Sequence, residues 1–325
     1  MSGIGAVSAI GAARPGAAHL ETDVLGIPGA EILPWFVLAA GILGLILGSF
    51  LNVVILRVPR GESLFPGSRC PKCGRLIRAW QNVPVISWIV LGGRCARCRE
   101  RISLRYPLIE LATGAIFAGV AWWLVSAFGW PGDETLPAIA WWLTVIAYFW
   151  FAAAGIALTV IDVEHHRLPD SIVGPAFIVV GVALAAAALL SADGPEWPRL
   201  IWAAVGAAGL FLLYLIIVMV TPNGMGGGDL KLAPVTGIVM GFIGWGALAV
   251  GAFAGFALGA VFGICLIIMG RAKRRSPIPF GPFMLLGAWI GIIWGSGSCR
   301  RTSSSSASRS RRVRGGPERA TAGVS

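Results

Sequence analysis

Long apolar runs separated by short polar segments make up the chain from residue 33 to residue 295. An apolar run of about 17 or more residues is long enough for a helix that crosses the hydrocarbon core of a bilayer. Eight such spans are predicted, and the sixth and seventh share one apolar stretch that is too long for a single helix. Glycines around Trp245 provide the turn between these two spans. The predicted spans are 33–56, 106–128, 138–161, 172–190, 200–220, 230–245, 247–269 and 279–295.

The composition supports an integral membrane protein. Hydrophobic residues make up 56% of the 325 positions and charged residues only 13%, which gives a mean hydropathy of +0.79. A soluble domain of this length does not need so much apolar surface. We therefore predict an all-α polytopic membrane protein, surrounded by the lipid bilayer and containing about eight transmembrane helices.

The distribution of positive charge predicts the orientation of these spans. The formal net charge is +11, but seventeen of the 26 Lys and Arg residues fall on one face of an eight-span chain, most of them in 57–105. The loops of the opposite face hold only Arg14 and Arg199. Because Lys and Arg mark cytoplasmic loops, segment 57–105 is predicted to be cytoplasmic. Topology explains the basic charge, so we expect no nucleic-acid partner.

The two ends of the chain differ from its apolar centre. Residues 1–31 lack the charged start and apolar core of a cleaved signal, and we expect a loose segment before the first transmembrane helix, 32–56. Residues 296–325 are rich in Ser, Arg and Gly, which predicts a disordered tail. Its seven arginines fall on the outer face of the eight-span topology, against the positive-inside rule. An inward tail would require one of the last three spans to be re-entrant.

The cytoplasmic insert at 57–105 carries two Cys-x-x-Cys pairs, Cys70 with Cys73 and Cys95 with Cys98. Four thiolates in this arrangement suit tetrahedral zinc at a closed structural site. Two disulfides or a redox pair are the alternatives. The reducing cytosol disfavours disulfides, and no β-α-β pattern surrounds either pair. We therefore predict a structural zinc ion that supplies much of the folding energy of this small segment.

Two aspartates are predicted to meet at the cytoplasmic end of the spanning region, 106–295. Asp162 ends the third predicted span and Asp229 opens the sixth. Carboxylates inside spans are rare and indicate function. Because two spans return the chain to its starting face, both aspartates belong to the same face. The polar segments beside them are short, so a facing pair is geometrically reasonable.

Such a pair has the chemistry of an aspartic protease. Two carboxylates about 4 Å apart repel by about 4 kcal/mol at an effective dielectric constant of about 20. They therefore share one proton, and the ionised partner can deprotonate a water molecule while the protonated partner polarises a scissile carbonyl. Gly226, Gly227 and Gly228 would let a substrate backbone approach Asp229 closely. Lys231 and the helix start would favour an ionised carboxylate nearby.

The same residues have simpler interpretations. Asp229 alone is also explained as a helix cap, and Asp162 as a solvated helix end. Asp170 follows Leu-Pro and precedes an apolar helix, so a cap is expected there. Glu110, at the start of the second span, is explained equally well by a pair with Arg105.

Several motifs together resemble the type IV prepilin leader peptidases, which are polytopic aspartic proteases of the G-x-G-D class. The resemblance runs in order from about residue 45 to about residue 290. The motifs are Gly48-Ser-Phe-Leu-Asn-Val-Val54, the two cysteine pairs, Arg105-Tyr-Pro-Leu-Ile-Glu110, Leu168-Pro-Asp170, Gly226-Gly-Gly-Asp-Leu-Lys-Leu232 and Pro279-Phe-Gly-Pro282.

The resemblance implies an activity and a location. In this family two aspartates, which correspond by motif to Asp162 and Asp229, cut a basic leader from prepilins and pseudopilins. The cut is made at the cytosolic face of the bacterial inner membrane. Members with the cysteine-bearing segment tend also to methylate the new N-terminal residue with S-adenosylmethionine, so both activities are implied here. The alternatives are a peptidase without methyltransferase activity, or a zinc-containing membrane adaptor or channel whose aspartates line a polar cavity.

Overall fold

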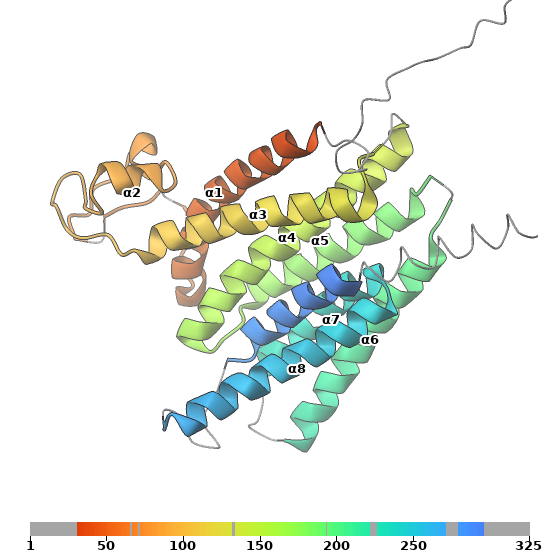
Figure 1. Cartoon of the computed structure of the whole chain (residues 1–325). Helices are drawn as coiled ribbons and strands as arrows, with labels where there is room; N and C mark the ends of the chain where they lie inside the picture. The colour runs from red at the N-terminus through yellow and green to blue at the C-terminus, as the bar shows by residue number, and fades with distance from the viewer. Residues whose placement is uncertain are drawn as a thin grey trace, which may run out of the picture.

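The computed structural model describes residues 31–65, 67–70, 72–131, 134–192, 194–221, 226–270 and 279–295. Within these residues every regular element is a helix (Figure 1). The elements are α1 (Leu33–Arg57), η1 (Val58–Arg60), η2 (Ala79–Asn82), α2 (Ile86–Val90), α3 (Arg105–Phe128), α4 (Thr135–His165), α5 (Asp170–Leu189), α6 (Trp197–Val220), α7 (Gly227–Ile243), α8 (Trp245–Ile268) and a final helix, Gly281–Gly295.

Each predicted span corresponds to one of these helices. Six of the described helices are long and apolar enough to cross a membrane, which confirms the all-α membrane fold. The other two, α7 with 17 residues and helix Gly281–Gly295, are shorter. The expected turn between the sixth and seventh spans is Gly244, whose φ of 137° is accessible to glycine at little cost. The tail 296–325 and the N-terminal segment before Glu31 lie outside the described residues.

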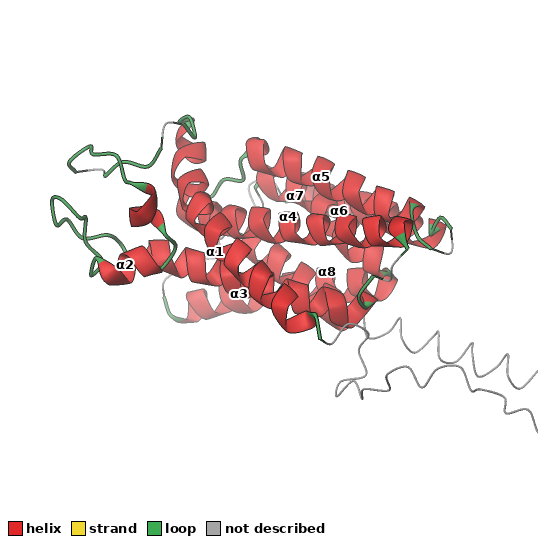
Figure 2. Ribbon diagram, turned by 90° about the horizontal axis from the view of Figure 1, so that it is seen from above, coloured by secondary structure: helices red, strands yellow, loops and turns green. Residues whose placement is uncertain are grey.

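Helix α7 packs against α5, α6 and α8 in the second half of the bundle, and Figure 2 shows the long helices extending away from the insert. Its contact with α6 is close because two glycines face each other. A Cβ on Gly237 would lie 2.2 Å from the carbonyl oxygen of Gly206. Small residues at such crossings let membrane helices approach closely, so α7 and Asp229 on it are held firmly.

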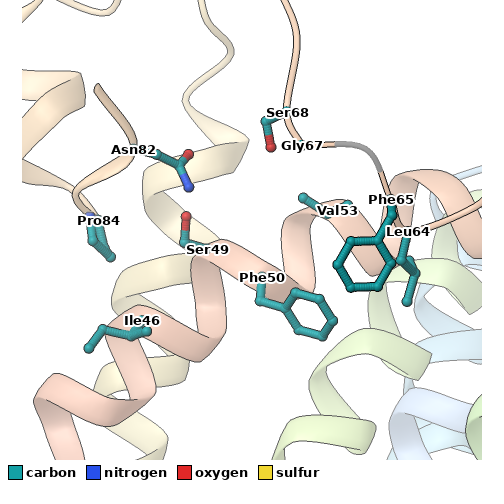
Figure 3. A pocket seen from close by; sticks show the side chains of 10 residues that line it. All are labelled: Ile46, Ser49, Phe50, Val53, Leu64, Phe65, Gly67, Ser68, Asn82 and Pro84. Carbon is teal, nitrogen blue, oxygen red and sulfur yellow. The ribbon is translucent and has the colours of Figure 1, made fainter. Parts of the chain in front are cut away.

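The first half of the bundle positions the cysteine insert. α1 packs along α3, and its ribbon changes direction near Ser49 and Phe50 (Figure 3). The segment after this bend buries Leu51 and Ile55 against Ile161 of α4. The insert follows α1 and lies at one end of the bundle (Figure 1). Because Ile161 precedes Asp162, the insert and Asp162 lie at the same end of the molecule.

Candidate active site and metal centre

Asp162 and Asp229 form the core of the candidate active site. Asp162 lies in the last turn of α4 and Asp229 in the first turn of α7. Their exposed fractions are only 5% and 6%, although both side chains are carboxylates. Gly281, which lies against Asp162, and Gly228, which precedes Asp229, are both close to Leu168. The fold therefore brings together two carboxylates from helices separated in sequence by α5 and α6. Burial of two such groups side by side is costly without compensating hydrogen bonds.

Glycines at two helix starts lie against the carboxylates. The N–H of Gly281 donates to Oδ2 of Asp162 over 3.1 Å, and a Cβ on Gly226 would lie 3.7 Å from Oδ2 of Asp229. Both glycines lie at a helix start, where the unpaired N–H groups and the helix dipole favour an anion. Two helix N-termini therefore converge on the aspartate pair.

Leu168 packs between the two helix starts. The side chain is buried and belongs to the loop between α4 and α5. A Cβ on Gly228 would lie 2.9 Å from Cβ of Leu168, and a Cβ on Gly281 would lie 3.5 Å from its Cδ1. The Gly281 Cβ would also lie 2.9 Å from Oδ2 of Asp162. Glycine is therefore required at 228 and 281 because Leu168 and Asp162 occupy the space that a side chain would need.

The three glycines before Asp229 have different surroundings. A Cβ on Gly226 would lie 3.7 Å from Oδ2 of Asp229, whereas a Cβ on Gly227 would meet no atom within 4 Å. Gly226 therefore borders the carboxylate and Gly227 faces open space. Gly228 faces Leu168 instead. If a substrate backbone approaches Asp229 closely, it therefore does so beside Gly226 and Gly227 and not beside Gly228.

Lys231 pairs with a different aspartate from the one expected. Its Nζ lies 2.7 Å and 2.8 Å from the two carboxylate oxygens of Asp170. The expected cap at Asp170 is wrong, because Pro169 occupies the cap position and no side-chain cap hydrogen bond forms. Asp170 is the first residue of α5, and its exposed side chain reaches across to α7. The ion pair links these two helices near the active site.

The partner of Glu110 also differs from the one suggested by the sequence. Arg105 pairs with Glu164 of α4 over 2.7 Å, so the expected Arg105–Glu110 pair is wrong. The buried Glu110 carboxylate instead accepts the backbone N–H of Val85 over 2.7 Å and lies within reach of the Ser49 hydroxyl. Glu110 therefore connects α3 to the insert and to α1.

The four cysteines of the insert form one cluster. All four Sγ atoms lie within 4.8 Å of one another, and Sγ of Cys70 is 3.7 Å from Sγ of Cys98. This separation is far longer than the disulfide bond of about 2.05 Å, and the cysteines are free thiols. Four convergent thiols match the ligand set of a tetrahedral metal site. The cluster can therefore hold a metal ion, as the spacing predicted.

The two halves of the cluster repeat one hydrogen-bond pattern. The N–H of Gly74 donates to the carbonyl of Cys70, and the N–H of Arg99 donates to that of Cys95. Gly74 and Arg99 both have a positive φ, which closes each turn around its cysteine pair. The backbone N–H groups of Arg97 and Cys98 lower the pKa of the Cys95 thiol to about 6. The N–H groups of Cys73 and Lys72 likewise lower the pKa of Cys70, so the first cysteine of each pair is prepared to be a thiolate.

Sequence reasoning did not find two residues beside the aspartate site, Gly281 and Leu168. It also missed Tyr214, which is buried on α6 and packs on Phe280, the residue before Gly281, with 6.0 Å between ring centroids. The signal for Gly281 was its place in the Pro279-Phe-Gly-Pro282 motif, but its partner lies 119 positions away in sequence.

Comparison with known proteins gives the same assignment for both halves of the chain. The family described as Bacterial Peptidase A24 N-terminal domain matches residues 42–124, which include the insert and most of α1 and α3. The Type IV leader peptidase family matches residues 148–264, which include Asp162 and Asp229. No solved structure matches the chain.

Curated relatives match over most of their length. A prepilin leader peptidase/N-methyltransferase of Stutzerimonas stutzeri is 36% identical over 286 residues, which cover 80% of this chain and 91% of the relative. Proteins of the same name from Pseudomonas aeruginosa and Neisseria gonorrhoeae are 33% and 37% identical. These matches cover 80% and 79% of this chain, and 91% and 90% of the relatives. The chain belongs to the type IV leader peptidase family, a family of proteases.

Proposed function

We propose that this chain is a membrane aspartic endopeptidase that removes the leader from type IV prepilins and pseudopilins, with Asp162 and Asp229 as its catalytic residues. The observation that carries the proposal is the buried pair itself, brought together by α4 and α7 and contacted by two helix starts. Structural carboxylates rarely occur in such pairs inside a membrane bundle.

Hydrolysis requires one proton on the pair. The ionised aspartate takes a proton from a water molecule, whose oxygen attacks the carbonyl carbon of the scissile peptide. The protonated aspartate donates its proton to the carbonyl oxygen, which forms a tetrahedral intermediate. The C–N bond then breaks as the nitrogen takes the proton of the aspartate pair. A hydroxyl of the intermediate gives its proton back to the ionised pair as the new carbonyl forms, so the pair again holds one proton. Water is the only reactant besides the peptide.

The position of the pair suits a substrate with a polar leader and an apolar helix. The helix of such a substrate can lie beside the bundle in the membrane, with its leader in the aqueous phase. Its scissile peptide then reaches Asp162 and Asp229 at the end of the bundle. The open space beside Gly227 is consistent with approach of an extended backbone. The names of the relatives give prepilins as substrates, and a prepilin joins a basic leader to an apolar helix. The basic residues of 57–105 support a cytosolic location for this end of the bundle.

We further propose that the chain N-methylates the new N-terminal residue, as the names of the relatives indicate. S-adenosylmethionine supplies the methyl group: the amine forms the N–C bond, the electrons of the C–S bond remain on sulfur, and water takes the proton of the amine. Zinc is the metal proposed for Cys70, Cys73, Cys95 and Cys98, because four thiolates prefer it. In this role zinc folds the insert and takes no part in peptide hydrolysis.

Cleavage of a purified prepilin by the purified protein in lipid nanodiscs tests this function. Mass spectrometry of the product gives the cut site and shows whether the new N-terminus carries a methyl group. We expect a product that lacks the leader and is heavier by one methyl group. An uncut prepilin would favour the adaptor or channel alternative. A cut but unmethylated product would indicate a peptidase without methyltransferase activity.

A further inference from the structure

A cavity of about 300 Å³ lies between α1 and the insert, outside the aspartate site (Figure 3). One wall is a face of α1 formed by Ile46, Ser49, Phe50 and Val53, whose spacing places them on the same side of the helix. The other wall is formed by residues of the insert, which are Leu64, Phe65, Gly67, Ser68, Asn82 and Pro84.

The lining combines aromatic rings with a few polar groups. Phe65 of the insert is 81% exposed, which is unusual for a phenylalanine outside the membrane. Phe50 is 50% exposed and lies on α1, a helix long and apolar enough to cross a membrane. Exposed rings of this kind stack on planar bases and attract cations to their faces. Ser49, Ser68 and Asn82 bring two hydroxyls and one amide to the same cavity. Apolar walls with a small number of polar groups are typical of small-molecule sites.

The rear of the cavity is held by the Glu110 carboxylate. Glu110 is only 8% exposed, and it accepts the N–H of Val85, the residue next to Pro84 in the lining. Val85 has a φ of 61°, a costly conformation for a β-branched residue that the surrounding contacts must hold. The same carboxylate lies within reach of Ser49. The Glu110 carboxylate therefore fixes the stretch next to Pro84 against α1 and α3.

The cavity lies on the opposite side of α1 from the helix that carries Asp162. Phe50 and Val53 line the cavity, whereas Leu51 and Ile55 of the same segment pack against Ile161. The diameter of a helix with its side chains is about 10–12 Å. A ligand in the cavity would consequently be separated from the aspartate site by about one helix.

We propose that this cavity is the binding site of the methyl donor, S-adenosylmethionine. The proposal rests on the methyltransferase function proposed above. Phe65 and Phe50 provide aromatic faces for the adenine or the sulfonium. Asn82, Ser49 and Ser68 match the hydrogen-bonding groups of the adenine and ribose, and the bond from Val85 to Glu110 holds the lining beside Pro84 in place. The insert therefore has a role in binding the donor. Zinc supports this role because it folds the insert.

Direct binding of S-adenosylmethionine tests the site without relying on turnover. The full-length, zinc-loaded protein in nanodiscs is equilibrated with methyl-labelled donor, and Kd is measured by dialysis. We expect Phe65→Ala and Asn82→Ala each to raise Kd about tenfold or more, since a stacked base loses that much affinity without its aromatic partner. Phe253→Ala, which removes an exposed ring on α8, is the matched control and should leave Kd unchanged. Ultraviolet cross-linking of the donor should label peptides that contain 46–53 or 64–84.

Three results would overturn the proposal. The first is a Kd within about twofold of the wild-type value in both variants, with cross-links elsewhere in the chain. The second is loss of prepilin cleavage in both variants with donor binding intact, which would assign the cavity to the prepilin. The third is a wild-type protein that neither binds the donor nor methylates the cleaved product, which would refute the methyltransferase function itself.

Discussion

The cysteine insert and the aspartate site are built in opposite ways. The insert gathers its four thiols from two short turns that are close in sequence, and each turn repeats the same backbone hydrogen bonds. Asp162 and Asp229 come from α4 and α7, and their partner Gly281 comes from a third helix. A metal can organise the first site alone. The second exists only when three helices pack correctly, so the two sites should respond differently to substitution.

The two regions also differ in what stabilises them. Between residues 58 and 104 the only buried hydrophobic residue is Cys70, so the described part of the insert has almost no apolar core. The helices around Asp229 are closely packed, and α7 buries most of its length. Metal binding should therefore contribute most of the folding free energy of the insert, whereas helix packing fixes the active site.

The largest effect is expected from the aspartates. Asp162→Asn and Asp229→Asn should each lower the rate of prepilin cleavage about 10³-fold or more, because an amide cannot take part in proton transfer. The measurement is the cleavage rate in nanodiscs beside membrane yield and zinc content, which should match the wild type. Residual cleavage above a few per cent in either variant would rule out the aspartate pair.

A large effect is also expected at Gly228. Gly228→Val should reduce cleavage about 10²-fold or more, because its Cβ would overlap Cβ of Leu168 and displace the start of α7. Gly209→Val on α6 is the matched control, since a Cβ there also meets no atom within 4 Å and Gly209 lies outside the proposed path of the substrate. Cleavage by the Gly209 variant should remain well above that of the Gly228 variant. Equal losses in the two variants would show that the effect at Gly228 does not depend on its contact with Leu168.

The contact between Gly228 and Leu168 can be tested as a pair. Gly228→Ala should impair cleavage less than valine does, and adding Leu168→Ala should restore part of the lost rate. Recovery is expected because the shorter side chain leaves space for the new Cβ. A double variant with no more activity than Gly228→Ala alone would contradict the packing explanation.

An intermediate effect is expected from metal loss. Replacing both Cys70 and Cys95 with Ser should release the zinc and lower methylation at least about tenfold, while prepilin cleavage stays within about threefold of wild type. Zinc is measured by mass spectrometry of the purified protein. Cys265→Ser, a free cysteine exposed on α8, is the control and should change neither property. Unchanged zinc content in the double variant would exclude the four-thiolate site.

The smallest effect is expected at the Lys231–Asp170 ion pair. The side chains are 55% and 71% exposed, and exposed pairs contribute little to stability. Lys231→Ala and Asp170→Asn should each leave cleavage within about threefold of the wild-type rate. A loss as large as that of Asp229→Asn would instead give Lys231 a direct role in substrate binding.

Sequence predicted the features that depend on local pattern or on helix order. Hydropathy located the helices, and the glycines near Trp245 marked the turn at Gly244. The aspartate pair followed from counting crossings, because an even number of spans separates Asp162 from Asp229. The cysteine cluster followed from spacing alone.

Contacts between distant residues could not be predicted. Hydropathy does not specify which side chains meet, so the bond from Gly281 to Asp162 and the pair of Lys231 with Asp170 were missed. A pair with Arg105 was one explanation of Glu110 from sequence, but the fold pairs Arg105 with Glu164 and Glu110 with the N–H of Val85. The bend of α1 that brings the insert beside Glu110 leaves no clear mark in the sequence.

Methylation of an already cleaved pilin by Asp229→Asn tests most directly whether the two regions act separately. The substrate is a pilin with its leader removed and its N-terminal amine free, and the readout is the mass of that N-terminus. We expect the Asp229→Asn protein to methylate it at a rate within about threefold of the wild type, although the same protein cannot cut prepilin. Failure to methylate the cleaved pilin, with zinc content and donor binding intact, would contradict the separation of the two sites.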